Sequence, residues 1–147
     1  MTIDPSNTQR RSTIQHVTFR DMCRKHLREM GVKLLGGREW PQWGVTVHEV
    51  AMFGHNKVYI RYCGSWAGIQ PGLKRSDTVK KFLQNAYSLK EEGDLTPFIV
   101  ITNHMPKRNS VSANMLKRAA YHGKIQGIYN IDCVEDEAAL RDLAGKP

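Results

Sequence analysis

The sequence predicts an α/β fold in which a mixed central sheet is flanked by helices. Three observations support this class: apolar residues at helical spacing, two β-rich segments joined by a short turn, and strands that alternate with helices later in the chain. A chain of 147 residues has the length of one domain and can bury about 70% of its unfolded surface. We therefore expect a flexible polar arm over residues 1–16 and a single domain over residues 17–147.

Four segments have the features of helices. In the first, Phe19, Cys23 and Leu27 fall on one apolar stripe, and Gly31 is placed to end the helix. The other three combine a polar residue that can cap a helix, or an acidic first turn, with an apolar stripe behind it. The helices are expected to begin at Thr18, at Ser76 or Asp77, at Ser112 and at Val134.

Five segments are rich in residues that favour strands. Two of them flank the turn at residues 54–57 and are expected to form a hairpin. The apolar segment 98–102 has no polar alternation, which is typical of a strand buried on both faces. The expected strands are Val32–Leu35, Val45–Phe53, Val58–Cys63, Phe98–Thr102 and Gly127–Ile131.

The charge of the chain is strongly positive and uneven. The formal net charge is +8, and the residues from Asp132 onward are acidic, so the preceding part is more basic still. A basic body with an acidic end is typical of proteins that bind polyanions. We expect a DNA or RNA partner, although a solvated basic surface would give the same composition.

Other sequence features bound the location and the cofactors. The three cysteines have no CxxC spacing, which indicates a reduced, cytoplasmic chain without disulfides. No apolar run is long enough to cross a bilayer, and the polar N-terminus does not resemble a secretory signal, so no membrane partner is expected. No cluster has the spacing of zinc ligands, and no metal ligands or other cofactors are predicted.

The candidate nucleic-acid-binding residues are cations near helix starts or along one helix face, together with one tryptophan. Cations that precede a helix start add to the free amides at that end, which favours phosphate. A tryptophan in a glycine-rich loop can stack on a base. The candidates are Arg24, Arg28, Trp66, Lys74, Arg75, Lys80, Lys81, Lys107 and Arg108.

The order of these elements resembles the PD-(D/E)xK nuclease superfamily, the fold of many restriction enzymes and Holliday-junction resolvases. The similar stretch runs from about Phe19 to Ile131, and its hairpin ends in Ile60-Arg61-Tyr62-Cys63-Gly64-Ser65, where the family has a form such as IECKGS. The resemblance implies a restriction-endonuclease-like fold. In that family, carboxylates on the hairpin bind Mg²⁺ ions that prepare water for attack on a phosphodiester.

The positions that match the family's catalytic residues are changed in this chain. Arg61 stands in place of the metal-binding Glu, Cys63 in place of the Lys, and His48 in place of the acid on the first strand, with Glu49 beside it. Since Arg61 would repel a metal ion, the resemblance implies a nuclease-like fold that binds nucleic acid without cleaving it. We expect Arg61 and Cys63 to face one side of the strand, with Arg61 paired to Glu49.

Three alternatives remain open at this stage. Asp77, with Glu49 and Asp21 nearby, could form a relocated Mg²⁺-dependent endonuclease site, although Asp77 is also explained as a helix cap. Cys63 could act as a nucleophile beside His48 or His104. The chain could also be a protein-interaction subunit, as a homo-oligomer or as the inactive partner of an active nuclease.

Overall fold

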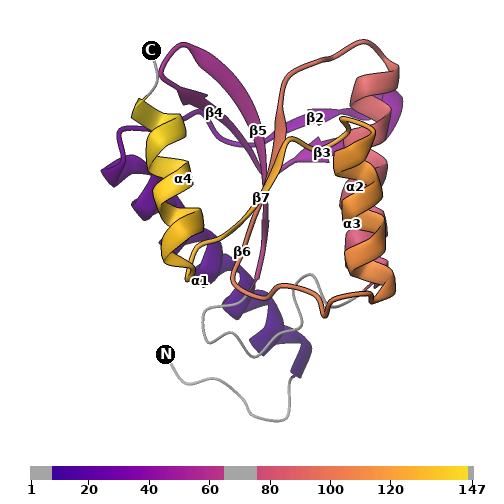
Figure 1. Cartoon of the computed structure of the whole chain (residues 1–147), viewed down its shortest axis with the longest axis horizontal. Helices are drawn as coiled ribbons and strands as arrows, with labels where there is room; N and C mark the ends of the chain where they lie inside the picture. The colour runs from indigo at the N-terminus through magenta and orange to yellow at the C-terminus, as the bar shows by residue number, and fades with distance from the viewer. Residues whose placement is uncertain (1–7, 65–75, 146–147) are drawn as a thin grey trace.

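A mixed five-stranded sheet lies between two pairs of helices (Figure 1). The computed structural model describes residues 8–64 and 76–145, and within them the side chains from Thr18 onward. The elements are α1 (Thr8–Glu29), β1 (Lys33–Leu34), β2 (Arg38–Trp40), the short 3-10 helix η1 (Pro41–Trp43), β3 (Val45–Val47), β4 (Glu49–Phe53), β5 (Asn56–Cys63), α2 (Ser76–Glu91), β6 (Phe98–Thr102), α3 (Val111–Tyr121), β7 (Gly127–Asn130) and α4 (Val134–Gly145). The predicted mixed sheet with flanking helices is therefore confirmed.

The sheet has the strand order β1-β4-β5-β6-β7. The first three strands pair antiparallel, and β5, β6 and β7 pair parallel, each parallel pair being joined through a helix. Strands β2 and β3 form a separate antiparallel pair. Strand β5 therefore lies at the centre, with an antiparallel neighbour on one side and a parallel neighbour on the other.

Each face of the sheet has its own apolar core. Helices α1 and α4 cover one face, where Phe19 and Leu27 pack on Ile60 and Ile101. Helices α2 and α3, with the β2–β3 pair, cover the other. All five residues of β6 are buried, as predicted for a strand covered on both sides.

The first helix begins earlier than the sequence predicted. It starts at Thr8, so Thr18 lies inside the helix and is not its N-cap, and part of the expected arm is helical. The polar composition of this stretch concealed the helix, because the apolar stripe begins only at Phe19. The helix ends before Gly31, whose φ of +91° suits glycine, as predicted.

The segment predicted as one strand over Val45–Phe53 is two strands, separated at His48. Before His48, β3 pairs with β2; after it, β4 pairs with β5. This change of partner explains why the apolar alternation of the segment is only loose. It also places His48 at a bend, next to the strand that contains Arg61.

The predicted start of α3 is shifted, whereas α2 begins at Ser76, one of its two predicted starts. The cap of α3 is Ser110, whose hydroxyl accepts a hydrogen bond from the Ala113 amide at 3.2 Å, while Ser112 is buried inside the helix. Helix α2 begins at Ser76, so Asp77 lies in its first turn and not at its cap. The positive end of the helix dipole favours a carboxylate in that turn.

Candidate functional site

The alternation of side chains along β5 separates two sets of polar residues. Cys63 belongs to the core on the α2–α3 side, and Tyr62 belongs to the core on the α1–α4 side. Tyr59 also belongs to the α2–α3 core and Ile60 to the α1–α4 core, so the period of two in a strand puts Arg61 on the side of Cys63. The register pairs Glu49 with Ile60, so Glu49 lies on the same side as Tyr62.

We call the pocket at the end of β5 the arginine pocket. It has a volume of about 270 Å³ and lies where α1, the bend before β4, β5 and the first turns of α2 meet. It is lined by Arg20, His48, Arg61, Tyr62, Cys63, Thr78 and Lys81. Arg61, Cys63 and His48, which the resemblance matched to catalytic positions, therefore line one pocket.

The arginine pocket contains three cationic side chains and no carboxylate among its described lining residues. The Nε atoms of Arg20 and Arg61 are buried and have no hydrogen-bond partner in the part of the chain that the structure describes. Burial lowers the pKa of Arg61, and the nearby charge of Arg20 lowers it further. Buried donors without acceptors are costly, so this arrangement favours an anion.

His48 is fixed by its backbone neighbour and by a ring contact. Its Nδ1 accepts a hydrogen bond from the Tyr62 amide at 3.2 Å, and its ring stacks on the Tyr62 ring with centroids 6.2 Å apart. Because Nδ1 is an acceptor, the proton of the neutral imidazole lies on Nε2. The His48 ring, which the resemblance matched to an acidic position, therefore has its donor at Nε2.

Glu49 does not pair with Arg61, and this prediction is wrong. Glu49 is 1% exposed and lies 2.8 Å from Arg24 Nε. The Arg24 N–H is not aimed well enough for a hydrogen bond, so the contact is an ion pair. The carboxylate also accepts hydrogen bonds from the Tyr62 hydroxyl and the Gly36 amide. Glu49 is thus a buried, satisfied structural carboxylate.

The other predicted phosphate contacts are dispersed. Arg24 is committed to Glu49, whereas Arg28 is exposed one turn further along α1. Lys81 lines the arginine pocket, and the adjacent Lys80 lines a second cavity. Exposed cations also precede α3, and three candidates lie outside the described residues. The exposed cations before α3 are Lys107 and Arg108. The candidates outside the described residues are Trp66, Lys74 and Arg75.

The acidic residues proposed for a relocated metal site are not brought together. Asp77 is exposed and does not line the arginine pocket, and Asp21 lines a separate hollow along α1. Glu49 is enclosed by Arg24 and Tyr62. Within residues 18–64 and 76–145, no group of three or more His, Cys, Asp or Glu side chains has the geometry to hold a metal ion.

Cys63 has the environment of a structural thiol. It is 4% exposed, and burial raises its pKa to about 11, an effect that the charge of Arg61 only partly offsets. The thiol is therefore protonated near neutral pH, although it shares a pocket with His48. Nucleophilic attack requires a thiolate, so the geometry does not favour the cysteine mechanism.

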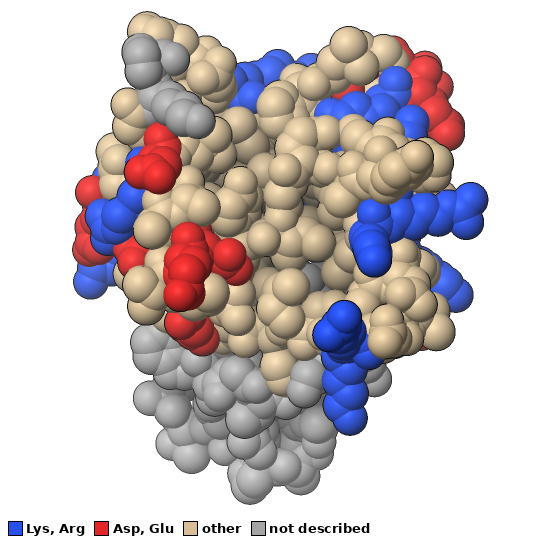
Figure 2. Space-filling view, in the orientation of Figure 1, with Lys and Arg blue, Asp and Glu red and all other residues tan. Residues whose placement is uncertain are grey.

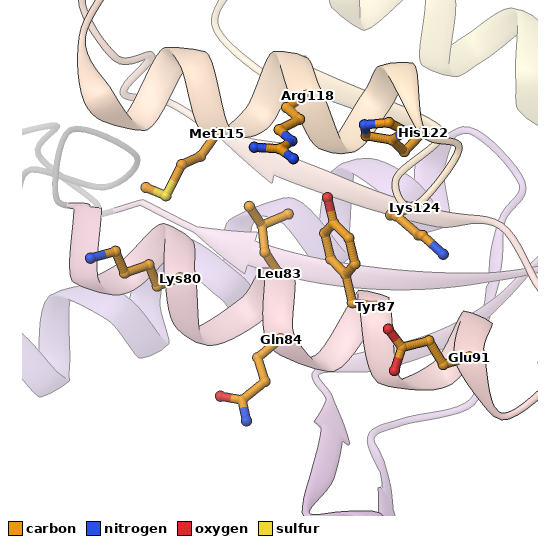
Figure 3. Close-up of a pocket in the computed structure, with 9 residues that line it drawn as sticks. All are labelled: Lys80, Leu83, Gln84, Tyr87, Glu91, Met115, Arg118, His122 and Lys124. Atoms are coloured by element: carbon orange, nitrogen blue, oxygen red, sulfur yellow. The ribbon is translucent and has the colours of Figure 1, made fainter.

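A larger groove that the sequence did not predict lies between α2 and α3, and we call it the helix groove (Figure 3). It has a volume of about 680 Å³ and presents Tyr87 from α2, Arg118 from α3 and Lys124 from the segment after α3. The spacing of Lys80, Gln84 and Tyr87 along one helix face was the available signal. Figure 2 shows several basic side chains on the α2–α3 side, with an acidic patch at its upper end, and mostly acidic side chains over α4.

The comparisons with known proteins add no assignment. A scan against protein-family models, a search of curated proteins and a search of solved structures each find no match to this chain. Among the described helices, none is long and apolar enough to cross a bilayer.

Proposed function

We propose that this chain is a nucleic-acid-binding protein with a restriction-endonuclease-like fold and no cleavage activity of its own. The observation that supports this function best is the arginine pocket, where Arg61 and Lys81 lie with Arg20 and no described carboxylate. A mixed sheet whose central strand carries Arg61 and Cys63 is what this proposal requires.

The charges of the pocket oppose a metal ion and favour phosphate. A divalent cation about 4 Å from one arginine is repelled by about 8 kcal/mol at an effective dielectric constant of 20. The same field attracts a phosphate group, and buried guanidinium donors form short, strong hydrogen bonds with its oxygens. In this proposal, the cations of the pocket neutralise the phosphate, which is the role of the metal in the nucleases.

The test is salt-dependent binding of a labelled oligonucleotide. If the protein contacts about six phosphates, the affinity should fall about 10³-fold between 50 and 200 mM salt. Replacing two of the pocket's cations (Arg61→Gln with Lys81→Gln) should weaken binding to all sequences and lower the slope of log K against log salt by about 2. The control is Lys33→Gln, at an exposed position on β1. It removes one charge, as each of the two pocket substitutions does, and should bind like the wild type.

Two results would contradict this function. Absence of binding by the wild type at 50 mM salt would exclude a nucleic-acid partner. Cleavage by the wild type with Mg²⁺ or Mn²⁺, abolished by Asp77→Asn, would instead identify an endonuclease with a relocated site. The Arg61→Gln, Lys81→Gln variant should remain as stable as the wild type, because it removes like charges that repel each other.

A further inference from the structure

The helix groove runs along one face of α2. Lys80, Gln84, Tyr87 and Glu91 recur at helical spacing on this face, and Arg118 and His122 line the opposite wall from α3 (Figure 3). The span from Lys80 to Glu91 is about 16 Å at 1.5 Å per residue. A stacked strand rises about 3.4 Å per nucleotide, so the groove has the length of about five nucleotides.

The charge along the groove suits an anionic occupant. Lys80, Arg118 and Lys124 are cationic, and Glu91 is the only acid among the lining residues, all of which are described. Lys80 and Arg118 are exposed on the α2–α3 side, where basic side chains gather in Figure 2. The phosphates of a nucleic-acid strand would neutralise these three cations.

The floor of the groove is apolar and aromatic. Leu83, Tyr87 and Met115 line it, and the Lys124 Nζ atom lies 5.4 Å from the centroid of the Tyr87 ring. A duplex hides the faces of its bases and offers only phosphates to such a surface. An unpaired strand exposes bases that stack on aromatic rings, next to phosphates that bind cations.

The helix groove and the arginine pocket each include a lysine from the second turn of α2. Lys80 lines the groove and Lys81 lines the pocket, although they are consecutive residues. The two cavities therefore lie on neighbouring sides of one helix.

We propose that the helix groove binds the unpaired nucleotides of a single strand. One base stacks on Tyr87, and Lys80, Arg118 and Lys124 contact the backbone. This proposal rests on the proposed nucleic-acid-binding function and adds a preference for single strands to it.

The experiment measures fluorescence anisotropy of labelled oligothymidylate, a duplex of equal length and an abasic strand of equal length. The wild type should bind oligothymidylate more tightly than either of the other probes. Tyr87→Leu, which keeps an apolar side chain, should weaken oligothymidylate binding about tenfold, the loss expected for one stacked base, and leave abasic binding unchanged. Tyr87→Phe, which keeps an aromatic ring, should bind oligothymidylate like the wild type. Arg118→Gln, which removes a proposed backbone contact, should weaken binding of oligothymidylate. Its control is Lys117→Gln, at an exposed cation on α3 outside the groove, which should bind like the wild type.

The possible failures are distinguishable. If Tyr87→Leu binds oligothymidylate like the wild type while Arg61→Gln with Lys81→Gln binds weakly, the groove proposal is overturned and the function stands. Equal affinity for the thymidylate and abasic strands also overturns it. An oligoglutamate peptide that competes as well as oligothymidylate would show a groove for acidic protein segments. If the wild type binds no probe, both proposals fail.

Discussion

The ion pair between Arg24 and Glu49 provides the most direct test of how this fold is held together. Replacing Arg24 by Met keeps much of the side-chain volume but leaves a carboxylate that is 1% exposed without its cation. The carboxylate retains its hydrogen bonds from the Tyr62 hydroxyl and the Gly36 amide. The change therefore isolates the charge contact between α1 and the first residue of β4.

The structure bounds the size of the effect. Removing one partner of a fully buried ion pair costs about 3–5 kcal/mol. Arg24 is 30% exposed, so solvent already screens part of the attraction, and a loss of about 2 kcal/mol is expected for Arg24→Met. Glu49→Gln should cost about 1 kcal/mol, since the amide oxygen still accepts a hydrogen bond and Arg24 can turn toward water.

Chemical denaturation at pH 7, followed by circular dichroism, measures both changes and their combination. The double variant Arg24→Met with Glu49→Gln should lose less than the sum of the single losses, with a coupling of about 1 kcal/mol or more. Arg28→Met, at an exposed position one turn along α1, is the control and should change stability by less than about 0.5 kcal/mol. Strict additivity would refute the charge contact.

Two further predictions concern titratable groups. Burial alone would raise the pKa of Asp94, but hydrogen bonds from Tyr59 and Thr96 outweigh it and the pKa is lowered. This group's contribution to stability is full above its ordinary pKa of 3.8 and is lost as the pH falls through the lower folded value. Melting temperatures from pH 6 to 2 should fall more steeply for the wild type than for Asp94→Asn; parallel curves would exclude the contribution. In native alkylation by iodoacetamide followed by mass spectrometry, Cys133 should react, while the buried Cys63 should react only after unfolding. Rapid labelling of native Cys63 would contradict its buried environment.

The sequence was informative wherever a local pattern coincided with the buried surface. The stripe of Val79, Phe82 and Ala86 lies in the core as predicted, and the bounds of β6 are those expected from its unbroken apolar run. Gly31 ends α1 because its backbone adopts a positive φ. In each of these cases, residues close in sequence determine the outcome.

The candidate site was predictable only in part. The alternation along β5 correctly placed Arg61 and Cys63 on one side, but the partner of Glu49 depends on which face the neighbouring strand presents. The bend at His48 reverses that face, and no local pattern marks it. The helix groove depends on the approach of α2 and α3, so Tyr87 and Lys124 meet only in the folded chain.

The second turn of α2 supplies one lysine to each of the two cavities. A helix turns by about 100° per residue, so the lysines at 80 and 81 point to different sides of the same rigid rod. Neither lysine can replace the other, and the two positions should give separable phenotypes when neutralised. Insertion of a single residue in this turn would rotate both lysines about the helix axis at once. The relative position of the two cavities therefore depends on a single helix.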